Sequence, residues 1–165
     1  MTVMMSTVEY RDRVAALLAR PLFSGPHLGR ALPPGWLPLI ERLTTALEAL
    51  PDGNALRCVQ LKTKLGGLRC YLEGSGFRLD NVKTGESFVQ SQDDPLLADA
   101  QELVLAAEAE SLRLCMVCGA PEEQRPEVWV TTACDEHASL MRGDVLADYR
   151  AVVGDLLAVG LEVYQ

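Results

Sequence analysis

The sequence has no long hydrophobic run and no secretory leader. No uncharged apolar stretch among its 165 residues approaches the roughly 20 that a membrane span requires. Met1 to Glu9 lacks the basic start and apolar centre of a secretory signal. The cysteines have the spacing of metal ligands, and free thiols suit a reducing compartment. We therefore expect a cytoplasmic protein that does not contact a membrane.

Positive charge is also scarce. Lys and Arg together number 15 against 23 Asp and Glu, which gives a net charge of −8 and a pI near 4.7. Broad electrostatic binding of nucleic acid needs an excess of Lys and Arg on some face. The composition argues against that mode of binding and leaves only a local basic patch open.

The remaining composition is that of a globular domain. Hydrophobic residues make up 48% and charged residues 23%, which excludes wholesale disorder. The length is enough for one domain with a core, or for a core with a zinc appendage, and one domain is the better interpretation. We expect a single domain over residues 1–165, with an N-terminal helix and loop (1–34), a helix-hairpin-helix core (35–110), a zinc module (111–142) and a C-terminal helix (143–165).

The most specific motif is a pair of cysteines followed, after fifteen residues, by a cysteine and a histidine. Cys115 and Cys118 are separated by two residues, as are Cys134 and His137. A two-residue gap lets the chain fold back so that both ligands reach one cation at about 2.3 Å. Gly119 supplies the positive φ that such a knuckle often needs. A β-rich stretch over 128–132 and a short helix from 135 to 141 then predict a treble-clef-like module holding one zinc per chain.

Two alternatives bear on this motif. Chance proximity of three cysteines and a histidine is disfavoured by the matched gaps. A catalytic zinc keeps an open position for water, whereas four protein ligands close the coordination shell. We therefore expect a structural zinc.

Helices are predicted by apolar spacing and by their stop signals. The first runs over 7–20, the second starts at Gly35 and ends before Pro51, and the third starts at Asp94 and Pro95, with Glu108 and Glu110 facing outward. A last helix is expected after 144. The Gly- and Pro-rich stretch 21–34 reads as an irregular loop, in which His27 is a surface residue.

Residues 55–74 predict an antiparallel hairpin, because apolar residues alternate on both sides of Gly66 and Gly67. A two-residue turn at these glycines places Lys64 opposite Arg69 and Lys62 opposite Tyr71. Cys58 and Cys70 are expected to be buried as small hydrophobes rather than joined as a disulfide. A second hairpin is expected from 77–79 and 87–89.

The basic face of this hairpin has two interpretations. It is either an ordinary solvated sheet face or a partner-binding surface formed by Lys62, Lys64, Arg69 and Tyr71. In the second case an anionic partner relieves the repulsion between facing cations.

These motifs together resemble an uncharacterised family of small bacterial and phage-associated proteins. The resemblance is carried by the Lys-x-Lys-Leu-Gly-Gly-Leu-Arg-Cys-Tyr hairpin, by the Ala-Glu-x-x-Ser end of the third helix at 107–111, and by the Cys-x-x-Cys and Cys-x-x-His pairs. Leu65 and Cys70 replace the aromatic residues usual in the family. The resemblance implies a shared fold, without an activity, and an association with mobile elements and with toxin or defence neighbourhoods.

Three function classes follow. The first is a non-enzymatic, zinc-stabilised binding protein, such as an immunity or antitoxin-type inhibitor or a phage-derived modulator, which acts on a protein partner. The alternative is a nucleic-acid-binding zinc module. A zinc enzyme is disfavoured, because the sequence lacks the upstream motif of a nucleobase deaminase, a phosphate loop or nucleophile elbow, and any histidine beyond His27 and His137.

Overall fold

The computed structural model describes residues 5–75, 78–80, 83–84, 87–89, 93–122, 124–125 and 131–138. Four α-helices lie in these ranges: α1 (Thr7–Leu18), α2 (Leu37–Glu48), α3 (Pro95–Ser111) and α4 (Asp135–Ala138). The strands form three antiparallel pairs: β1 (Cys58–Lys64) with β2 (Gly67–Leu72), β3 (Arg78–Asp80) with β4 (Ser87–Val89), and β5 (Gln124–Arg125) with β6 (Thr131–Thr132). The chain is therefore mixed α and β, as expected.

The predicted starts of the first and third helices are confirmed, whereas α2 begins at Leu37 and not at Gly35. The Ser6 hydroxyl accepts a hydrogen bond from the Glu9 amide and caps α1. The Asp94 side chain caps α3 through the Leu96 amide, with Pro95 in the first turn. A 3₁₀ turn, Pro34–Trp36, leads into α2. The helix expected over 143–165 lies outside the described residues.

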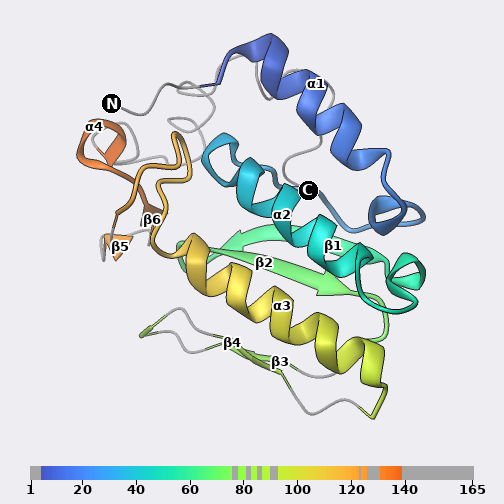
Figure 1. Ribbon diagram of the computed structural model, residues 1–165. Coiled ribbons are helices and arrows are strands. Elements are labelled where there is room, and N and C mark those ends of the chain that lie inside the picture. Colours follow the sequence, from blue (N-terminus) through green and yellow to red (C-terminus); the bar gives the residue numbers. More distant parts are fainter. Residues whose placement is uncertain are drawn as a thin grey trace.

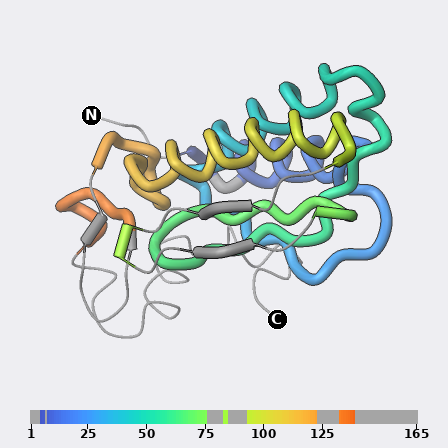
Figure 2. Tube along the Cα trace, turned by 90° about the horizontal axis from the view of Figure 1, so that it is seen from below, coloured from blue at the N-terminus to red at the C-terminus, as the bar shows by residue number. Residues whose placement is uncertain are grey.

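Helices α2 and α3 lie side by side over one face of the β1–β2 sheet, and α1 lies on the far side of α2 from α3 (Figures 1 and 2). Their apolar sides and that sheet face form one core. Burying a large apolar side chain stabilises the fold by about 1.5–3 kcal/mol. The largest fully buried apolar side chains are Trp36, Tyr10, Leu22, Leu32, Leu37, Ile40, Leu47, Leu61, Leu68 and Leu72. No helix in the described part of the chain is both long and apolar enough to span a bilayer.

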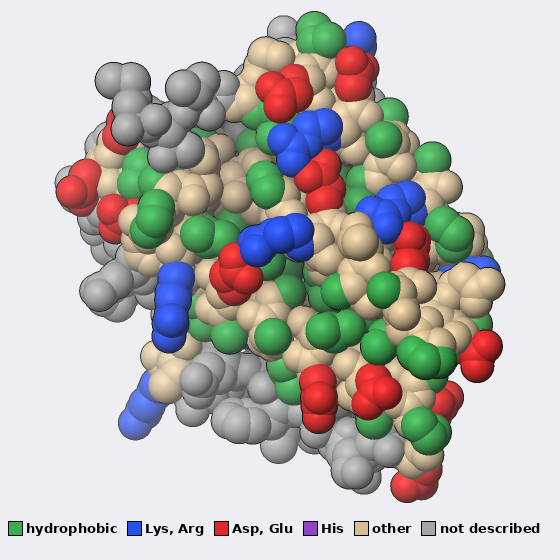
Figure 3. Space-filling model, viewed as in Figure 1, with side chains coloured by type: hydrophobic (Ala, Val, Ile, Leu, Met, Phe, Trp, Pro, Cys, Tyr) green, Lys and Arg blue, Asp and Glu red, His purple; other side chains and the backbone are tan. Residues whose placement is uncertain are grey.

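Ion pairs join α1 to α2 at the rim of this core. Arg13 pairs with Glu41, and Arg20 pairs with Glu48 at 2.6 Å. In both pairs the glutamate lies 28 residues after its arginine, so the two helices run parallel. The acidic and basic side chains of the helical layer lie next to each other on the surface (Figure 3).

The connection between α1 and α2, predicted from the sequence to be an irregular loop, forms backbone hydrogen bonds with β1. Leu28 donates its amide to the Val59 carbonyl at 2.8 Å, and the Leu61 amide donates to Gly29 at 3.0 Å. Arg30 forms a parallel bridge with Leu61. The segment 28–31 therefore lies along the outer edge of β1, and His27 just before it is exposed, as expected.

The hairpin turn lies one residue earlier than the sequence predicted. Lys64 pairs with Gly67 and Lys62 pairs with Arg69, so the turn residues are Leu65 (φ 53°) and Gly66 (φ 76°). Both have positive φ, as a type I′ turn requires. Gly67 is the first residue of β2, where a Cβ would lie 2.7 Å from Leu112 Cδ2.

Helix α3 lies against the outer edge of β2. The Leu68 amide donates to Ser111 Oγ at 2.8 Å, and the Cys70 amide donates to Glu108 Oε1 at 2.9 Å. Glu108 is only 3% exposed. The expectation that Glu108 faces outward is therefore wrong, because the unpaired strand amides need an acceptor.

Candidate metal centre

The four predicted ligands come together at the end of the helical layer. Cys115 and Cys118 lie in a knuckle that follows α3, and Cys134 and His137 lie at the start of α4. Their ligand atoms are all within 4.8 Å of one another. These four residues form a cluster that could hold a metal ion.

The distances within the cluster match those of a tetrahedral metal site. With metal–sulfur bonds of about 2.3 Å and a metal–nitrogen bond of about 2.05 Å, a tetrahedron has sulfur–sulfur edges of about 3.8 Å and sulfur–nitrogen edges of about 3.5 Å. Cys118 Sγ lies 3.8 Å from Cys134 Sγ. Cys115 Sγ lies 3.6 Å from His137 Nδ1, and Cys134 Sγ lies 3.2 Å from the same nitrogen. A single cation at the centre would contact all four atoms.

The electrostatics of the cluster also favour a cation. Cys115 and His137 are buried, whereas Cys118 and Cys134 are half-buried. The pKa of Cys118 is raised to about 12, chiefly by burial and to a smaller extent by the neighbouring sulfurs of Cys115 and Cys134. Crowded sulfurs resist ionisation on their own, but a bound divalent cation deprotonates a coordinating thiol outright. The donor set of three sulfurs and one imidazole suits a soft or borderline metal.

The knuckle is shaped by backbone hydrogen bonds. The Gly119 amide donates to the Cys115 carbonyl at 2.8 Å, and the Cys115 amide donates to the Ala120 carbonyl at 2.8 Å. Gly119 has a φ of 76°, as its position after the second cysteine predicted. Its backbone conformation returns the chain so that Cys115 and Cys118 direct their sulfurs to one point.

The second ligand pair is held by β6 and the first turn of α4. The Met116 amide donates to the Thr132 carbonyl at 2.9 Å, which joins the knuckle to β6. The amides of His137 and Ala138 donate to the Cys134 carbonyl at 3.0 and 2.7 Å. Of the stretch 128–132 that the sequence predicts as a strand, residues 131–132 are described, and they form β6. The expected continuation of α4 to 141 lies outside the described residues.

The knuckle is docked directly on the start of α2. The Gly35 amide donates to the Met116 carbonyl at 2.9 Å, and Trp36 Nε1 donates to the Leu114 carbonyl at 2.9 Å. A Cβ at Gly35 would lie 2.1 Å from the Cys115 carbonyl oxygen. The metal cluster is therefore fixed to the helical core through a close contact between two backbones.

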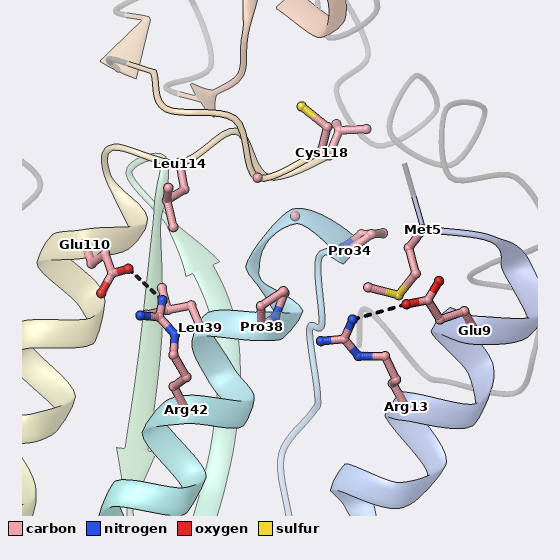
Figure 4. A pocket seen from close by; sticks show the side chains of 13 residues that line it. Met5, Glu9, Arg13, Pro34, Pro38, Leu39, Arg42, Glu110, Leu114 and Cys118 are labelled. Carbon is pink, nitrogen blue, oxygen red and sulfur yellow. Dashed lines mark hydrogen bonds and ion pairs between the residues drawn. The ribbon is translucent and has the colours of Figure 1, made fainter. Parts of the chain in front are cut away.

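A pocket of about 520 Å³ lies beside this contact, between α1, α2 and the knuckle (Figure 4). Arg13 contacts Glu9 at 3.4 Å and Arg42 contacts Glu110 at 2.6 Å, so each guanidinium that lines the pocket faces a carboxylate. The Cys118 sulfur points away from these arginines (Figure 4). The pocket is lined by charged groups of both signs.

The predicted partner-binding residues share one side of the hairpin but differ in exposure. Because the turn lies one residue earlier, each partner changes by two positions and each residue keeps its side of the sheet. Lys64 is exposed, and Lys62 and Tyr71 are half-buried, with Lys62 Nζ 4.9 Å from the centre of the Tyr71 ring. Arg69 is fully buried and donates to the Leu68 carbonyl at 2.8 Å. The expectation that Arg69 is exposed on this face is wrong.

Sequence reasoning missed three residues that position the site. Gly35 allows the knuckle to approach α2, and Glu108 and Ser111 hold the edge of β2. The only sequence signal for the last two was their place in the motif at 107–111. Comparison with protein-family profiles, with curated proteins and with solved structures finds no match.

Proposed function

We propose that the cluster binds one structural zinc ion in a treble-clef-like module, and that the protein acts without catalysis by binding another protein. A structural metal is supported by the four protein ligand atoms, because they fill a tetrahedral coordination shell and leave no coordination position for water or substrate. The order of knuckle, two-stranded hairpin and helical turn supports the treble-clef description. The resemblance noted above suggests an immunity, antitoxin-type or phage-derived role.

The first test is the metal content of the purified protein. Elemental analysis of freshly purified, unchelated protein should find one zinc per chain. Cys118→Ser should lower both the zinc content and the melting temperature, because binding energy at a structural site is coupled to folding. Well under half an equivalent of metal in the wild-type protein contradicts the assignment.

The proposed contact is the hairpin surface, defined here as Lys62, Lys64 and Tyr71. It presents two ammonium groups and an aromatic ring in a chain whose net charge is −8. Tyr is enriched among the residues that dominate binding energy at interfaces, and the local positive charge suits an acidic patch on the partner. Arg69 is fully buried, so it takes no part in the contact itself.

The test compares two variants with the same change in net charge. Lys62→Glu with Lys64→Glu alters the hairpin surface, whereas Arg11→Glu with Lys83→Glu alters exposed residues elsewhere. Affinity capture from the native host should lose its partner with the first variant and keep it with the second. Neither variant should melt more than a few degrees below the wild type, since substitutions at the exposed Lys64, Arg11 and Lys83 usually change stability by about 0.5 kcal/mol or less. The half-buried Lys62 adds the loss of its contact with the Tyr71 ring, about 0.5–1 kcal/mol.

The alternative function is nucleic-acid binding through the same lysines. Its signature is capture that disappears after nuclease treatment, or direct binding of labelled DNA or RNA that weakens steeply with salt. The net charge of −8 opposes this alternative. Capture that survives the hairpin variant in full refutes the assigned surface for either class of partner.

A further inference from the structure

A β-bulge brings the two remaining cysteines together in the core. Cys58 pairs with Leu72 and Gln60 pairs with Tyr71, so β1 has an extra residue at this point. In a regular strand, Cys58 and Leu61 would face opposite sides, because they are three residues apart. The bulge turns Cys58 to the side of Leu61 and Cys70. Its Sγ lies 3.7 Å from Cys70 Sγ, and both residues are 1% exposed.

A buried arginine, Arg30, lies next to this part of β1. Arg30 is 5% exposed, and it enters the core from the segment that bridges β1 at Leu61. Its guanidinium lies 5.2 Å from the centre of the Phe23 ring, and Nη2 donates to the Phe23 carbonyl at 3.4 Å. Nη1 is buried and has no hydrogen-bond partner among the described residues.

The positive charge of the Arg30 guanidinium would be stabilised by a nearby anion. A buried, uncompensated charge is strongly unfavourable, and no carboxylate pairs with Arg30 in the described part of the chain. The groups that favour its charged form are Cys58 and Cys70. Reciprocally, the hydrogen bond between the two thiols lowers the pKa of Cys58, burial opposes this effect, and the charge of Arg30 lowers the pKa further.

We propose that Cys58 and Cys70 form a peroxide-reactive thiol pair, in which the Cys58 thiolate beside Arg30 is oxidised and Cys70 then closes a disulfide across the hairpin. The two sulfurs need to approach from 3.7 Å to about 2.0 Å. The two cysteines lie on adjacent antiparallel strands as diagonal neighbours, Cys58 opposite Leu72 and Cys70 opposite Leu61. The site is separate from the metal cluster and from the hairpin surface.

The reaction has two steps. The Cys58 thiolate attacks one oxygen of hydrogen peroxide, the O–O bond breaks, and the departing hydroxide takes up a proton from solvent to become water; Cys58 is left as a sulfenic acid. The Cys70 sulfur then attacks the Cys58 sulfur, the S–O bond breaks, and the hydroxyl leaves as a second water with the Cys70 proton. The pair loses two electrons in total, and one peroxide is reduced to two waters.

The first experiment uses the wild-type, zinc-loaded chain. Trypsin cleaves after Arg57, Lys62, Arg69 and Arg78, so Cys58 and Cys70 fall in separate peptides, 58–62 and 70–78. After brief treatment with hydrogen peroxide, a non-reducing digest should contain these two peptides joined by a disulfide. The metal-ligand cysteines in the same digest serve as the internal control and should still be alkylated after denaturation. If they are oxidised first while Cys58 and Cys70 remain reduced, the proposal is overturned.

The second experiment separates the roles of the two cysteines. In Cys70→Ser the sulfenic acid on Cys58 has no thiol to close on, so dimedone should trap it after peroxide treatment. Absence of that adduct in folded, zinc-loaded protein contradicts Cys58 as the attacking group.

The third experiment removes the charge. Arg30→Met should slow disulfide formation about tenfold or more, since an adjacent opposite charge shifts a pKa by about one unit or more, and Arg30→Lys should recover part of that rate. An unchanged rate in Arg30→Met refutes the role of Arg30. If Arg30→Met does not fold, the wild-type digest and the Cys70→Ser trapping decide the proposal without it.

Discussion

Replacing Gly35 by alanine should separate the metal module from the helical core. The new Cβ would lie 2.1 Å from the Cys115 carbonyl oxygen, 2.6 Å from the Gly119 nitrogen and 2.8 Å from the Met116 carbonyl carbon. All three are backbone atoms of a knuckle held by its own hydrogen bonds, so no flexible side chain can move aside. Gly35 does not have a positive φ, so alanine is not strained by its own backbone conformation.

The size of the effect follows from the contacts that are lost. Displacing the knuckle breaks the hydrogen bonds from the Gly35 amide and from Trp36 Nε1, at about 1 kcal/mol each. Overpacking adds about 1–3 kcal/mol, and the reduced entropy of the unfolded chain returns about 0.4–1 kcal/mol. The free energy of unfolding should therefore fall by about 2–5 kcal/mol. For a chain of this length that corresponds to a melting temperature lower by about 4–20 °C.

The assay is thermal unfolding followed by circular dichroism, with zinc content measured on the same samples. Gly25→Ala is the matched control, because no atom lies within 4 Å of its added Cβ and only its positive φ opposes the change. That control should cost about 1–2 kcal/mol. Gly35→Ala should still bind one zinc, since no ligand is altered. A melting temperature for Gly35→Ala equal to or above that of Gly25→Ala refutes the docking described here.

Three further predictions concern the edge of β2, the core and the metal. Glu108→Ala should lower the free energy of unfolding in urea by about 1–3 kcal/mol, because the Cys70 amide loses its acceptor. Glu110→Ala, on the same helix but in an exposed ion pair, should lower it by less than about 1 kcal/mol. A larger loss of stability for Glu110→Ala than for Glu108→Ala contradicts the edge contact. Burial raises the pKa of Tyr10 above its ordinary value of 10.0, so stability that is complete below about pH 10 should decline above it as the unfolded chain ionises; urea unfolding at pH 9 and pH 11 should show a smaller decline for Tyr10→Phe, and an equal decline rules out this residue. Chelation of the metal should lower the melting temperature of the wild type, and have little effect on Cys118→Ser, which has already lost a ligand.

The metal cluster was predictable from sequence because its determinants are local. Each ligand pair lies within four residues, and Gly119 encodes the return of the knuckle by its own backbone preference. The proximity of the two pairs is then set by one short hairpin. Helix starts were predictable for the same reason, since Ser6 and Asp94 cap their helices through amides two or three residues away.

The hairpin register was harder to predict because tertiary packing decides it. Two adjacent glycines favour a turn centred on both, yet Gly67 pairs with Lys64 in β2 and lies against the Leu112 side chain. Leu65 adopts the positive φ that the local sequence would assign to glycine. Leu112 follows α3 and is more than forty residues further along the chain than Gly67.

The burial of charged residues likewise could not be predicted from the sequence pattern. Glu108 and Arg69 have the polarity of surface residues, but α3 and the hairpin edge enclose them. Periodicity counts how often an apolar residue recurs, and it does not reveal which polar group meets an unpaired amide. The same limit applies to Arg30, whose neighbours come from a segment predicted to be an irregular loop.

Both edges of the β1–β2 sheet are occupied where the structure describes them, by residues 28–31 beside β1 and by the side chains of Glu108 and Ser111 beside β2. A partner that binds by adding a strand, or another copy that aggregates edge to edge, needs a row of free amides and carbonyls. Along these stretches it would have to displace existing hydrogen bonds first. Recognition by this sheet must then depend on side chains rather than on backbone, so partner specificity could change through substitutions at the hairpin surface while the strand pairing stays the same.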